Sequence, residues 1–545
     1  MKKIKLFTLG LAAASSLMLT GCLEETIPTS GITEAALQTS PKAGEALLNA
    51  VPAQAKSNFI LGRSDLHFDI GYPGLMHVRD VMTADMAIEV SPSGYDWYEN
   101  YEFLERLDDG YVFAQYVWNT LYRMVLVTNN SVAVFPAGTG DKTIDSYRGM
   151  SLAYRAGMYL ELSQLYEWLP NDVTKEINDN GNNIAGLTVP IVTDETSQQA
   201  ATENPRATHA DMVKFILEDL TEAEQLLAGY RYDDVDLPNL EVVYGLKARC
   251  YMWDASYTGD DSKYADAARY ARMAIETGGH TPLTSEEWLS TTQGFNTAFK
   301  SWMWGFHYMS EDAAVRSGII NWPSWMANEA LYGYSNAEPF VKIGKELYDR
   351  MNNTDFRKLS YKAPQGSPLA GREPIIYQNA YSGFSDYTSF KFRPGNGDIE
   401  DSNVGNVVSV PMMRVEEMYL IEAEATAHTN PTGGKDLLET FVKTYRDSEY
   451  TCLATDIAGV VDACFQQKRI EFFGEGISFF DYKRLNKSVD RQYEGNNFKD
   501  GSRFKTEGRP GWMNFIITRQ ESDSNGALKG MNNPSFTDLY QSLDE

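Results

Sequence analysis

The stretch LKARCYMWDASYTGDDSKYADAARYARMAIETGG, Leu246–Gly279, decides the fold. Its first half places Leu246, Cys250 and Trp253 on one face of a helix, because apolar residues recur there at helical spacing. The polar turn TGDDSK follows, and a second apolar stripe starts at Tyr264. We expect the closing Gly-Gly pair to end this second helix, since glycine readily adopts the left-handed conformation of a helix terminus. The stretch therefore predicts two helices joined by a short turn.

This helix pair has neighbours of the same kind. With its turn it spans roughly 35 residues, the length of a tetratricopeptide-type unit. Upstream, the segment SYRGMSLAYRAGMYLELSQLYEWLP carries small residues such as Gly149 and Ala156 at helical spacing, which lets two helices approach closely. Another helix is predicted from about Thr208 to Ala228. Asp211 stands three residues after Thr208, so this pair resembles a capping box at the start of the helix. Several helix pairs therefore form the predicted scaffold.

The chain changes character between about 281 and 410. Gly, Pro, Asn, Ser and aromatic residues dominate there, and one alternating run, Ser301–Tyr308, indicates a strand. Helices return with MMRVEEMYLIEAEATA, Met412–Ala427. We therefore expect one mainly α-helical domain over 46–545. In it a helical scaffold (46–280) and a C-terminal helical region (411–545) carry an irregular insert (281–410), where ligand binding is expected.

The N-terminus reads as an export signal. A basic start is followed by an apolar run from Leu6 to Leu19, too short for a membrane span. The run ends in Leu-Thr-Gly-Cys, which resembles a bacterial lipobox with Cys22 as the acylated residue. We expect a signal peptide at 1–21 and a tether at 22–45; the alternative is an ordinary signal peptide with an incidental cysteine. Of the other three cysteines, Cys250 is expected in the core, whereas Cys452 and Cys464 could pair.

Charge and missing motifs exclude several functions. The formal net charge is −27, which argues against nucleic acid or an anionic membrane surface as a partner. The six histidines form no zinc-binding pattern, and the loop at 138–143 lacks the spacing of a phosphate-binding loop. No Gly-x-Ser-x-Gly elbow occurs and no segment matches an EF-hand, so neither a metal nor another cofactor is predicted. A glycosidase carboxylate pair can be neither found nor dismissed among 75 acidic residues.

Aromatic side chains in polar loops are the predicted ligand contacts. A sugar ring can stack its C–H face on such a ring while polar neighbours bind its hydroxyl groups. Asp80 is a possible polar contributor, although local capping or ion pairing is the stronger interpretation. For each aromatic ring the alternative is simple packing over the core, which we expect for Trp302 and Trp304. The candidate rings are Tyr95, Trp97, Trp322, Trp325 and Tyr332.

The stretch RIEFFGEGISFFDYKRLN, Arg469–Asn486, crowds charges among phenylalanines. Such a mixture can be an active site, because apolar surroundings shift carboxylate pKa values. It can equally be a set of buried ion pairs that joins parts of a scaffold, and we favour this interpretation. We call these five residues the latch: Arg469, Glu471, Glu475, Asp481 and Arg484.

Several of these segments together resemble one family, the SusD/RagB-like nutrient-binding outer-membrane lipoproteins. The matching segments include VWNTLYRMVLVTNN, the helix pair at 246–279 and the helix RVEEMYLIEAEA. The latch stretch is similar to the family's Glu-Gly-x-x-x-x-Asp-x-x-Arg signature, and Leu-Glu-Glu after Cys22 is similar to an acidic surface-export signal of Bacteroidetes lipoproteins. The segments occur in family order and cover nearly the whole mature chain.

The resemblance implies a mainly α-helical fold with four tetratricopeptide-like helix pairs and a looser ligand-binding region. It implies no catalysis. It also implies capture of glycans, or in some members peptides, for a SusC-type TonB-dependent outer-membrane transporter. The alternative of a lipoprotein glycoside hydrolase has no motif in its favour. No ligand motif of the family can be aligned residue by residue, so the ring assignments above depend on composition and position alone.

Overall fold

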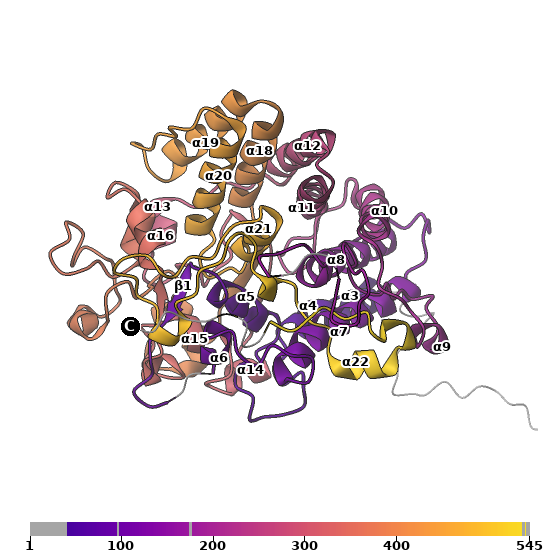
Figure 1. Cartoon of the computed structure of the whole chain (residues 1–545), viewed down its shortest axis with the longest axis horizontal. Helices are drawn as coiled ribbons and strands as arrows, with labels where there is room; N and C mark the ends of the chain where they lie inside the picture. The colour runs from indigo at the N-terminus through magenta and orange to yellow at the C-terminus, as the bar shows by residue number, and fades with distance from the viewer. Residues whose placement is uncertain (1–40, 95–96, 174–176, 537–539, 541–545) are drawn as a thin grey trace, which may run out of the picture.

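The predicted helix pair is present in the computed structural model, which describes residues 41–94, 97–173, 177–536 and 540 (Figure 1). Helices α11 (Leu240–Thr258) and α12 (Asp261–Gly278) pack on each other, and left-handed Gly279 ends the second one, as predicted. Cys250 and Trp253 are buried between neighbouring helices. The helical spacing of apolar residues within this stretch was sufficient to predict the helix pair.

The N-terminal scaffold extends from this pair. Helix α7 (Val112–Val134) packs on α8 (Lys142–Tyr166), and α8 packs on α10 (His209–Leu227). Gly149 is needed for the second contact, because a Cβ atom there would lie 3.0 Å from a side-chain carbon of Leu227. The helix predicted at Thr208–Ala228 is confirmed, since the hydroxyl of its N-cap Thr208 accepts from the backbone N–H three residues on.

A second group of helices closes the scaffold from the C-terminal part of the chain. Helix α12 packs on α18 (Val415–Thr429), which also contacts α19 (Pro431–Tyr445) and α20 (Ile457–Glu471). Figure 1 shows α18, α19 and α20 standing beside α11 and α12. Helix α21 (Ser478–Arg484) follows and contacts α20, α11 and α5. Segments more than a hundred residues apart therefore form one continuous helical layer.

Two short antiparallel sheets fix the irregular part of the chain to the scaffold. Strand β2 (Trp302–His307) confirms the predicted strand and pairs with β4 (Ser409–Arg414). The prediction that Met412 starts a helix was wrong, because the first three residues of that segment hydrogen-bond in β4 before α18 begins. Strand β1 (Met86–Ile88) pairs with β3 (Val341–Ile343), so the scaffold region near residue 87 also contacts the insert.

The remaining helices are short or lie near the chain ends. The α-helices are α3 (Pro41–Leu48), α4 (Ala50–Ala55), α5 (Tyr72–Val81), α6 (Glu99–Glu102), α9 (Gln198–Ala201), α13 (Ser285–Leu289), α14 (Ala313–Arg316), α15 (Trp322–Met326), α16 (Lys345–Arg350), α17 (Ser402–Gly405) and α22 (Arg519–Ser524). The 3-10 helices are η1 (Ser335–Ala337), η2 (Phe356–Ser360), η3 (Gln378–Gly383), η4 (Gly395–Gly397), η5 (Asp500–Ser502), η6 (Gly511–Met513) and η7 (Gly526–Leu528). Between 281 and 410 only short helices and strands occur among the described residues.

Three further sequence expectations can be placed. Cys452 and Cys464 carry buried free thiols, so the disulfide left open by the sequence is not formed. Among the described residues, no helix combines the length and the apolar character needed to cross a membrane. The predicted signal peptide and Cys22, the predicted lipidation site, lie outside the described residues.

Candidate ligand-binding site

Trp97 heads a stack of aromatic rings at the start of α6. The Trp97 ring is half-buried and lies 5.2 Å, centroid to centroid, from the imidazole of His67. His67 in turn contacts the ring edge of Tyr334, and Tyr334 lies flat on Trp325 at 3.8 Å. We call these four residues the aromatic step. Because the three rings behind it are packed on one another, Trp97 is held as a preformed surface.

The predictions for Trp322 and Trp325 as exposed sugar-binding rings were wrong. Their exposed fractions are 2% and 4%, and all five residues of helix α15, which carries both, are buried. Trp322 meets the ring of Phe392 edge-on at 5.4 Å. Trp325 donates from its indole nitrogen to the carbonyl of His67, 3.4 Å away. Both rings therefore pack the core, and Trp325 supports Trp97 from behind.

The other three candidates have separate outcomes. Asp80 is 1% exposed and accepts a hydrogen bond from the backbone N–H of Gly476, so its prediction as a ligand contact was wrong. Tyr332 is half-buried, with its hydroxyl 3.4 Å from the carbonyl of Asp398. Tyr95 lies outside the described residues. Trp97 is therefore the predicted ring with the most direct structural support.

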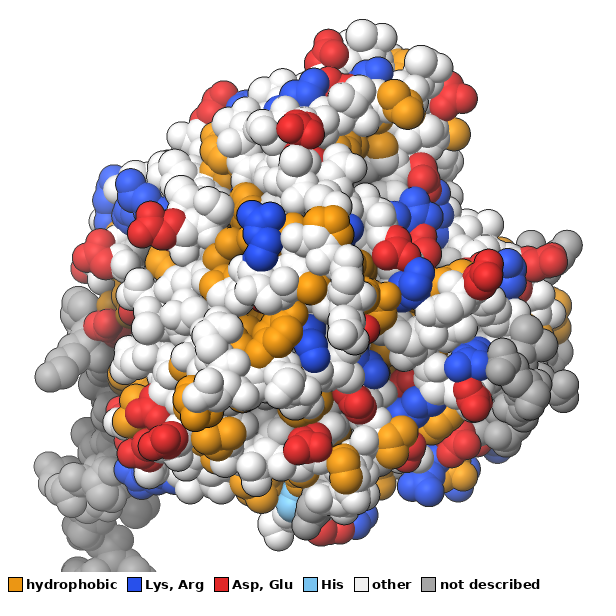
Figure 2. Space-filling model, turned by 90° about the vertical axis from the view of Figure 1, so that its left-hand side faces the viewer, with side chains coloured by type: hydrophobic (Ala, Val, Ile, Leu, Met, Phe, Trp, Pro, Cys, Tyr) orange, Lys and Arg blue, Asp and Glu red, His pale blue; other side chains and the backbone are white. Residues whose placement is uncertain are grey.

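A pocket on the loop-rich face is lined in part by η1, the segment that follows Tyr334 of the aromatic step. It encloses about 610 Å³, its open mouth included, and we call it the loop pocket. Leu331 and Tyr377, 53% and 52% exposed, lie at its rim. Its floor is apolar, and Asn336 and Glu338 supply polar groups. Figure 2 views the side of α13 and α16 and shows hydrophobic side chains gathered in patches between charged ones on that face.

The loop pocket and the aromatic step are connected through the backbone. Tyr334 belongs to the step, and η1, which follows it directly, lines the pocket. The hydroxyl of Ser91 also donates to the carbonyl of Ala337 at 2.6 Å, which ties the loop before Trp97 to η1. Sequence reasoning missed His67 and Tyr377. Tyr377 stands before Gln-Asn and could have been selected by the criterion used for Trp97.

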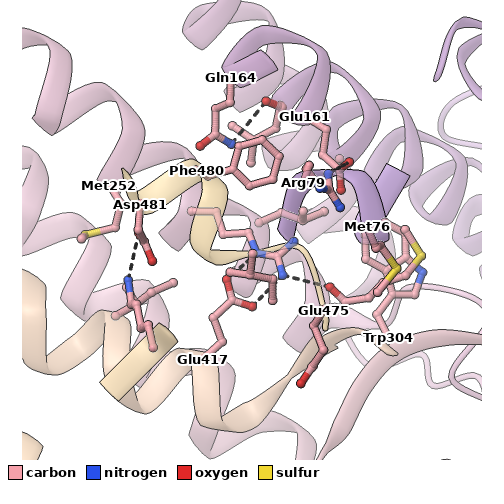
Figure 3. Close-up of a pocket in the computed structure, with 18 of the residues that line it drawn as sticks. Met76, Arg79, Glu161, Gln164, Met252, Trp304, Glu417, Glu475, Phe480 and Asp481 are labelled. Carbon is pink, nitrogen blue, oxygen red and sulfur yellow. Dashed lines mark hydrogen bonds and ion pairs between the residues drawn. The ribbon is translucent and has the colours of Figure 1, made fainter. Parts of the chain in front are cut away.

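A third feature is a central cavity between α5, α8, α11, α18 and α21, about 740 Å³ with its mouth (Figure 3). Two ion pairs form part of its wall. Arg79 contacts Glu161 at 2.8 Å, and Arg249 holds both carboxylate oxygens of Glu417 at 2.6 and 2.7 Å. In Figure 3 the ring of Phe480 lies beside Arg79, 4.9 Å from the guanidinium carbon. The charges of these two pairs are thus balanced within the protein, although Nε of Arg79 has no hydrogen-bond partner within the described part of the chain.

Three latch residues also line the central cavity, but their charges are paired. Glu475 accepts from Arg414 and Lys391, at 2.9 and 2.7 Å. Asp481 and Arg484 pair with each other, and Arg484 also contacts Glu424 at 2.6 Å. Because their charges are paired within the protein, these three residues have contacts typical of a structural role.

The other two latch residues, Arg469 and Glu471, are buried. Glu471 is fully buried and meets three arginines, Arg357, Arg414 and Arg446, at 2.7–3.0 Å. Burial alone would raise the pKa of Glu471, but these arginines outweigh burial and hold that pKa below its usual value. Arg469 reaches Asp85, 2.7 Å away, and so connects the C-terminal helices to the N-terminal part of the chain.

The comparisons with known proteins agree with this architecture. Residues 77–252 match a SusD-like family model described as "Starch-binding associating with outer membrane", and residues 365–525 match the model of the SusD family. The chain belongs to the SusD family. None of the curated proteins matches it in sequence.

Solved structures of the SusD superfamily share the fold over nearly the whole chain. A SusD-like carbohydrate binding protein from Bacteroides vulgatus is 22% identical, with a TM-score of 0.69 over 90% of this chain and 97% of its own. A superfamily member from Bacteroides thetaiotaomicron is 19% identical, with a TM-score of 0.66 over 91% and 99%. A third, from Parabacteroides distasonis, is 16% identical, with a TM-score of 0.64 over 90% and 98%. The predicted mainly α-helical SusD-like fold is thereby confirmed.

Proposed function

We propose that this SusD-family chain is a non-catalytic lipoprotein that binds glycans at the aromatic step and the loop pocket. The observation that carries the proposal is the partly exposed ring of Trp97, which packs on His67 and through it on Tyr334 and Trp325. Directly after Tyr334, η1 lines a pocket with an exposed tyrosine at its rim. A pyranose can stack on Trp97 or Tyr377 and bind Asn336 or Glu338 through its hydroxyl groups. Because the surface is preformed, little ordering entropy opposes binding.

The same proposal covers location and partner. Cys22 would carry the lipid that anchors the chain to the outer membrane at the cell surface. The bound glycan would pass to a SusC-like TonB-dependent transporter for import. What supports both statements is the SusD family membership together with the lipobox-like Leu-Thr-Gly-Cys.

One arrangement in the structure resembles a hydrolase site, and its geometry favours a structural role. His307 lies between Ser409 and Asp234, with its ring nitrogens 2.6 Å from the hydroxyl and 2.7 Å from the carboxylate. Ser409 is only 7% exposed and faces His307 across the β2–β4 pair. None of the three lines the central cavity or the loop pocket. A substrate bound in either of these two cavities would therefore not contact the hydroxyl group.

The proposed function is tested with a glycan array and a peptide panel, followed by calorimetry on the best ligand. We expect an oligosaccharide to bind with heat and without hydrolysis. Trp97→Ala should weaken its affinity at least about 10-fold, equivalent to about 1.4 kcal/mol. Tyr111→Ala is a matched control, because Tyr111 is 44% exposed and belongs to neither site. Unchanged affinity in both Trp97→Ala and Tyr377→Ala would refute the site, and binding of peptides alone would identify a peptide-capturing member.

A further inference from the structure

A second hollow lies away from the proposed glycan site. It is bordered by α16, the middle of α20 and the chain from Lys487 to Tyr493, and it encloses about 580 Å³ with its open mouth. It shares no lining residue with the loop pocket, the aromatic step or the central cavity. Helix α16 is at the left of Figure 1, on the side that Figure 2 turns to the viewer.

Aromatic rings form part of its wall. Tyr482 is buried and donates its hydroxyl hydrogen to Asp85 at 2.9 Å, so its ring is held in place. Phe465 lies on the preceding helix, at 4.9 Å from the Tyr482 ring and edge-on to it. Tyr493 is half-buried on the other side. Phe465 and Tyr482 are each 2% exposed, so Tyr493 is the ring of this wall that can offer its face to the C–H groups of a sugar.

The polar groups of the hollow carry no net charge. It is lined by three cationic side chains, Arg350, Arg469 and Lys487, and by three anionic ones, Glu346, Asp462 and Asp490. Such a balance favours a neutral ligand, because a charged ligand would meet like charges at short range. It is also unlike the chain as a whole, whose net charge is −27.

The ion pair at the rim is suited to hydroxyl groups. Lys487 and Asp462 lie 2.7 Å apart with side chains 28% and 46% exposed. An exposed pair of this kind contributes only about 0–1 kcal/mol, so exchanging it for ligand contacts costs little. A hydroxyl group accepts from an ammonium and donates to a carboxylate, and two neighbouring hydroxyls can engage both members of the pair. A carboxylate or amine ligand would satisfy only one of them.

We infer that this hollow is a second binding site, for a single neutral sugar unit. The ring of the sugar would lie against the partly exposed Tyr493, and its hydroxyl groups would bind Lys487 and Asp462. The inference does not depend on the proposed function, because it requires neither Trp97 nor the loop pocket.

The experiment is calorimetry and saturation-transfer NMR of the full-length mature chain with D-glucose, D-galactose, D-mannose, D-xylose and N-acetyl-D-glucosamine. We expect at least one to bind, and Asp462→Asn or Lys487→Met to weaken that binding at least 10-fold. Asp462 is nearly half exposed, so its amide variant should fold normally. Asp65→Asn is the matched control, because Asp65 forms an exposed ion pair with Arg63 and does not line the hollow, and it should leave this affinity unchanged.

Two results would overturn the inference. One is that none of the five sugars binds the folded wild-type chain. The other is that a sugar binds but its affinity is unaltered in Asp462→Asn, Lys487→Met and Tyr493→Ala. Loss of that binding in Trp97→Ala, with the rim variants unaltered, would assign the sugar to the aromatic step. That result would refute the second site while supporting the proposed function.

Discussion

Asp80 carries a carboxyl group that the fold removes from water. One oxygen accepts from the N–H of Gly476 at 3.0 Å, and the other has no hydrogen-bond partner within the described part of the chain. Burial is the largest influence and raises the pKa of Asp80 to about 8. The folded chain therefore keeps a proton that the unfolded chain releases above about pH 4. This contribution to stability is complete below pH 4 and is lost as the pH rises to about 8.

Asp80→Asn should remove this pH dependence. An amide has the shape of the protonated acid, can accept from Gly476 and does not titrate. We expect the melting temperatures of variant and wild type to be similar at pH 5. The variant should gain as the pH rises, by at most about 1.4 kcal/mol of unfolding free energy per pH unit. Thermal unfolding at pH 5, 6, 7 and 8 measures the difference.

The control for Asp80→Asn is Asp65→Asn. Asp65 is exposed and its pKa is lowered, chiefly by a hydrogen bond from Arg63, so it stays ionised from pH 5 to 8. Its substitution should therefore add no pH trend over that range. A constant difference between Asp80→Asn and wild type at all four pH values would show that Asp80 is ionised in the folded chain.

At the scale of single residues, the sequence identifies candidate side chains better than it predicts whether they are exposed. Trp97 and Trp322 both stand in Asn- and Ser-containing segments, yet only the first is partly exposed. The burial of Trp322 depends on Phe392, seventy positions later, and no local pattern reports that contact. His67 was missed for a related reason, because its role arises from the rings of Trp97 and Tyr334, which two other segments contribute.

At the scale of elements, ion pairs connect the latch to η2, β4, the end of α19 and Asp85 in the N-terminal part of the chain. The sequence identified its charged residues and favoured buried pairs. It could not identify the partners, since Arg357, Arg414 and Arg446 reach Glu471 from η2, β4 and the end of α19. The helix pair at 246–279 was predictable because its apolar stripes are local. The contact between α12 and α18 was not, because it joins segments more than a hundred residues apart.

Arg484→Ala tests whether the latch is structural. The Arg484 side chain is 6% exposed and pairs with Glu424 and Asp481. Without it, Lys468 would be the remaining ion-pair partner of both carboxylates among the described residues, 2.8 Å from Glu424 and 3.4 Å from Asp481. Removing one partner of a buried pair leaves uncompensated charge, so the unfolding free energy should fall by about 3–5 kcal/mol. Differential scanning calorimetry measures the loss. Affinity for the best oligosaccharide should stay unchanged in the folded fraction.

The control for Arg484→Ala lies on the outer face of α12. Arg269 pairs with Asp266 at a similar distance, but both side chains are 40–51% exposed, so Arg269→Ala should cost less than about 1 kcal/mol. A stable Arg484→Ala variant that no longer binds ligand would contradict the structural interpretation. It would instead make the central cavity, which Arg484 lines, the binding site.

The whole molecule presents a strongly negative field to any ligand, with a net charge of −27. A basic peptide would be attracted over distances near the Debye length, about 10 Å at 0.1 M salt, and added salt would screen that attraction. A neutral glycan feels no such force and depends on stacking and short hydrogen bonds. The ionic strength of the buffer therefore separates the two ligand classes without knowledge of the site.

We expect affinity for the natural ligand class to be insensitive to salt. Calorimetry of the best oligosaccharide at 50 and 500 mM NaCl should give dissociation constants within about 2-fold of each other, because neither partner's long-range charge contributes. A lysine-rich peptide of similar size is the control, and its weak binding should decrease at least about 10-fold over the same range. If instead the tightest ligand found shows that steep decrease, the negative surface itself is the recognition element. The chain would then be a peptide-capturing member of the SusD family.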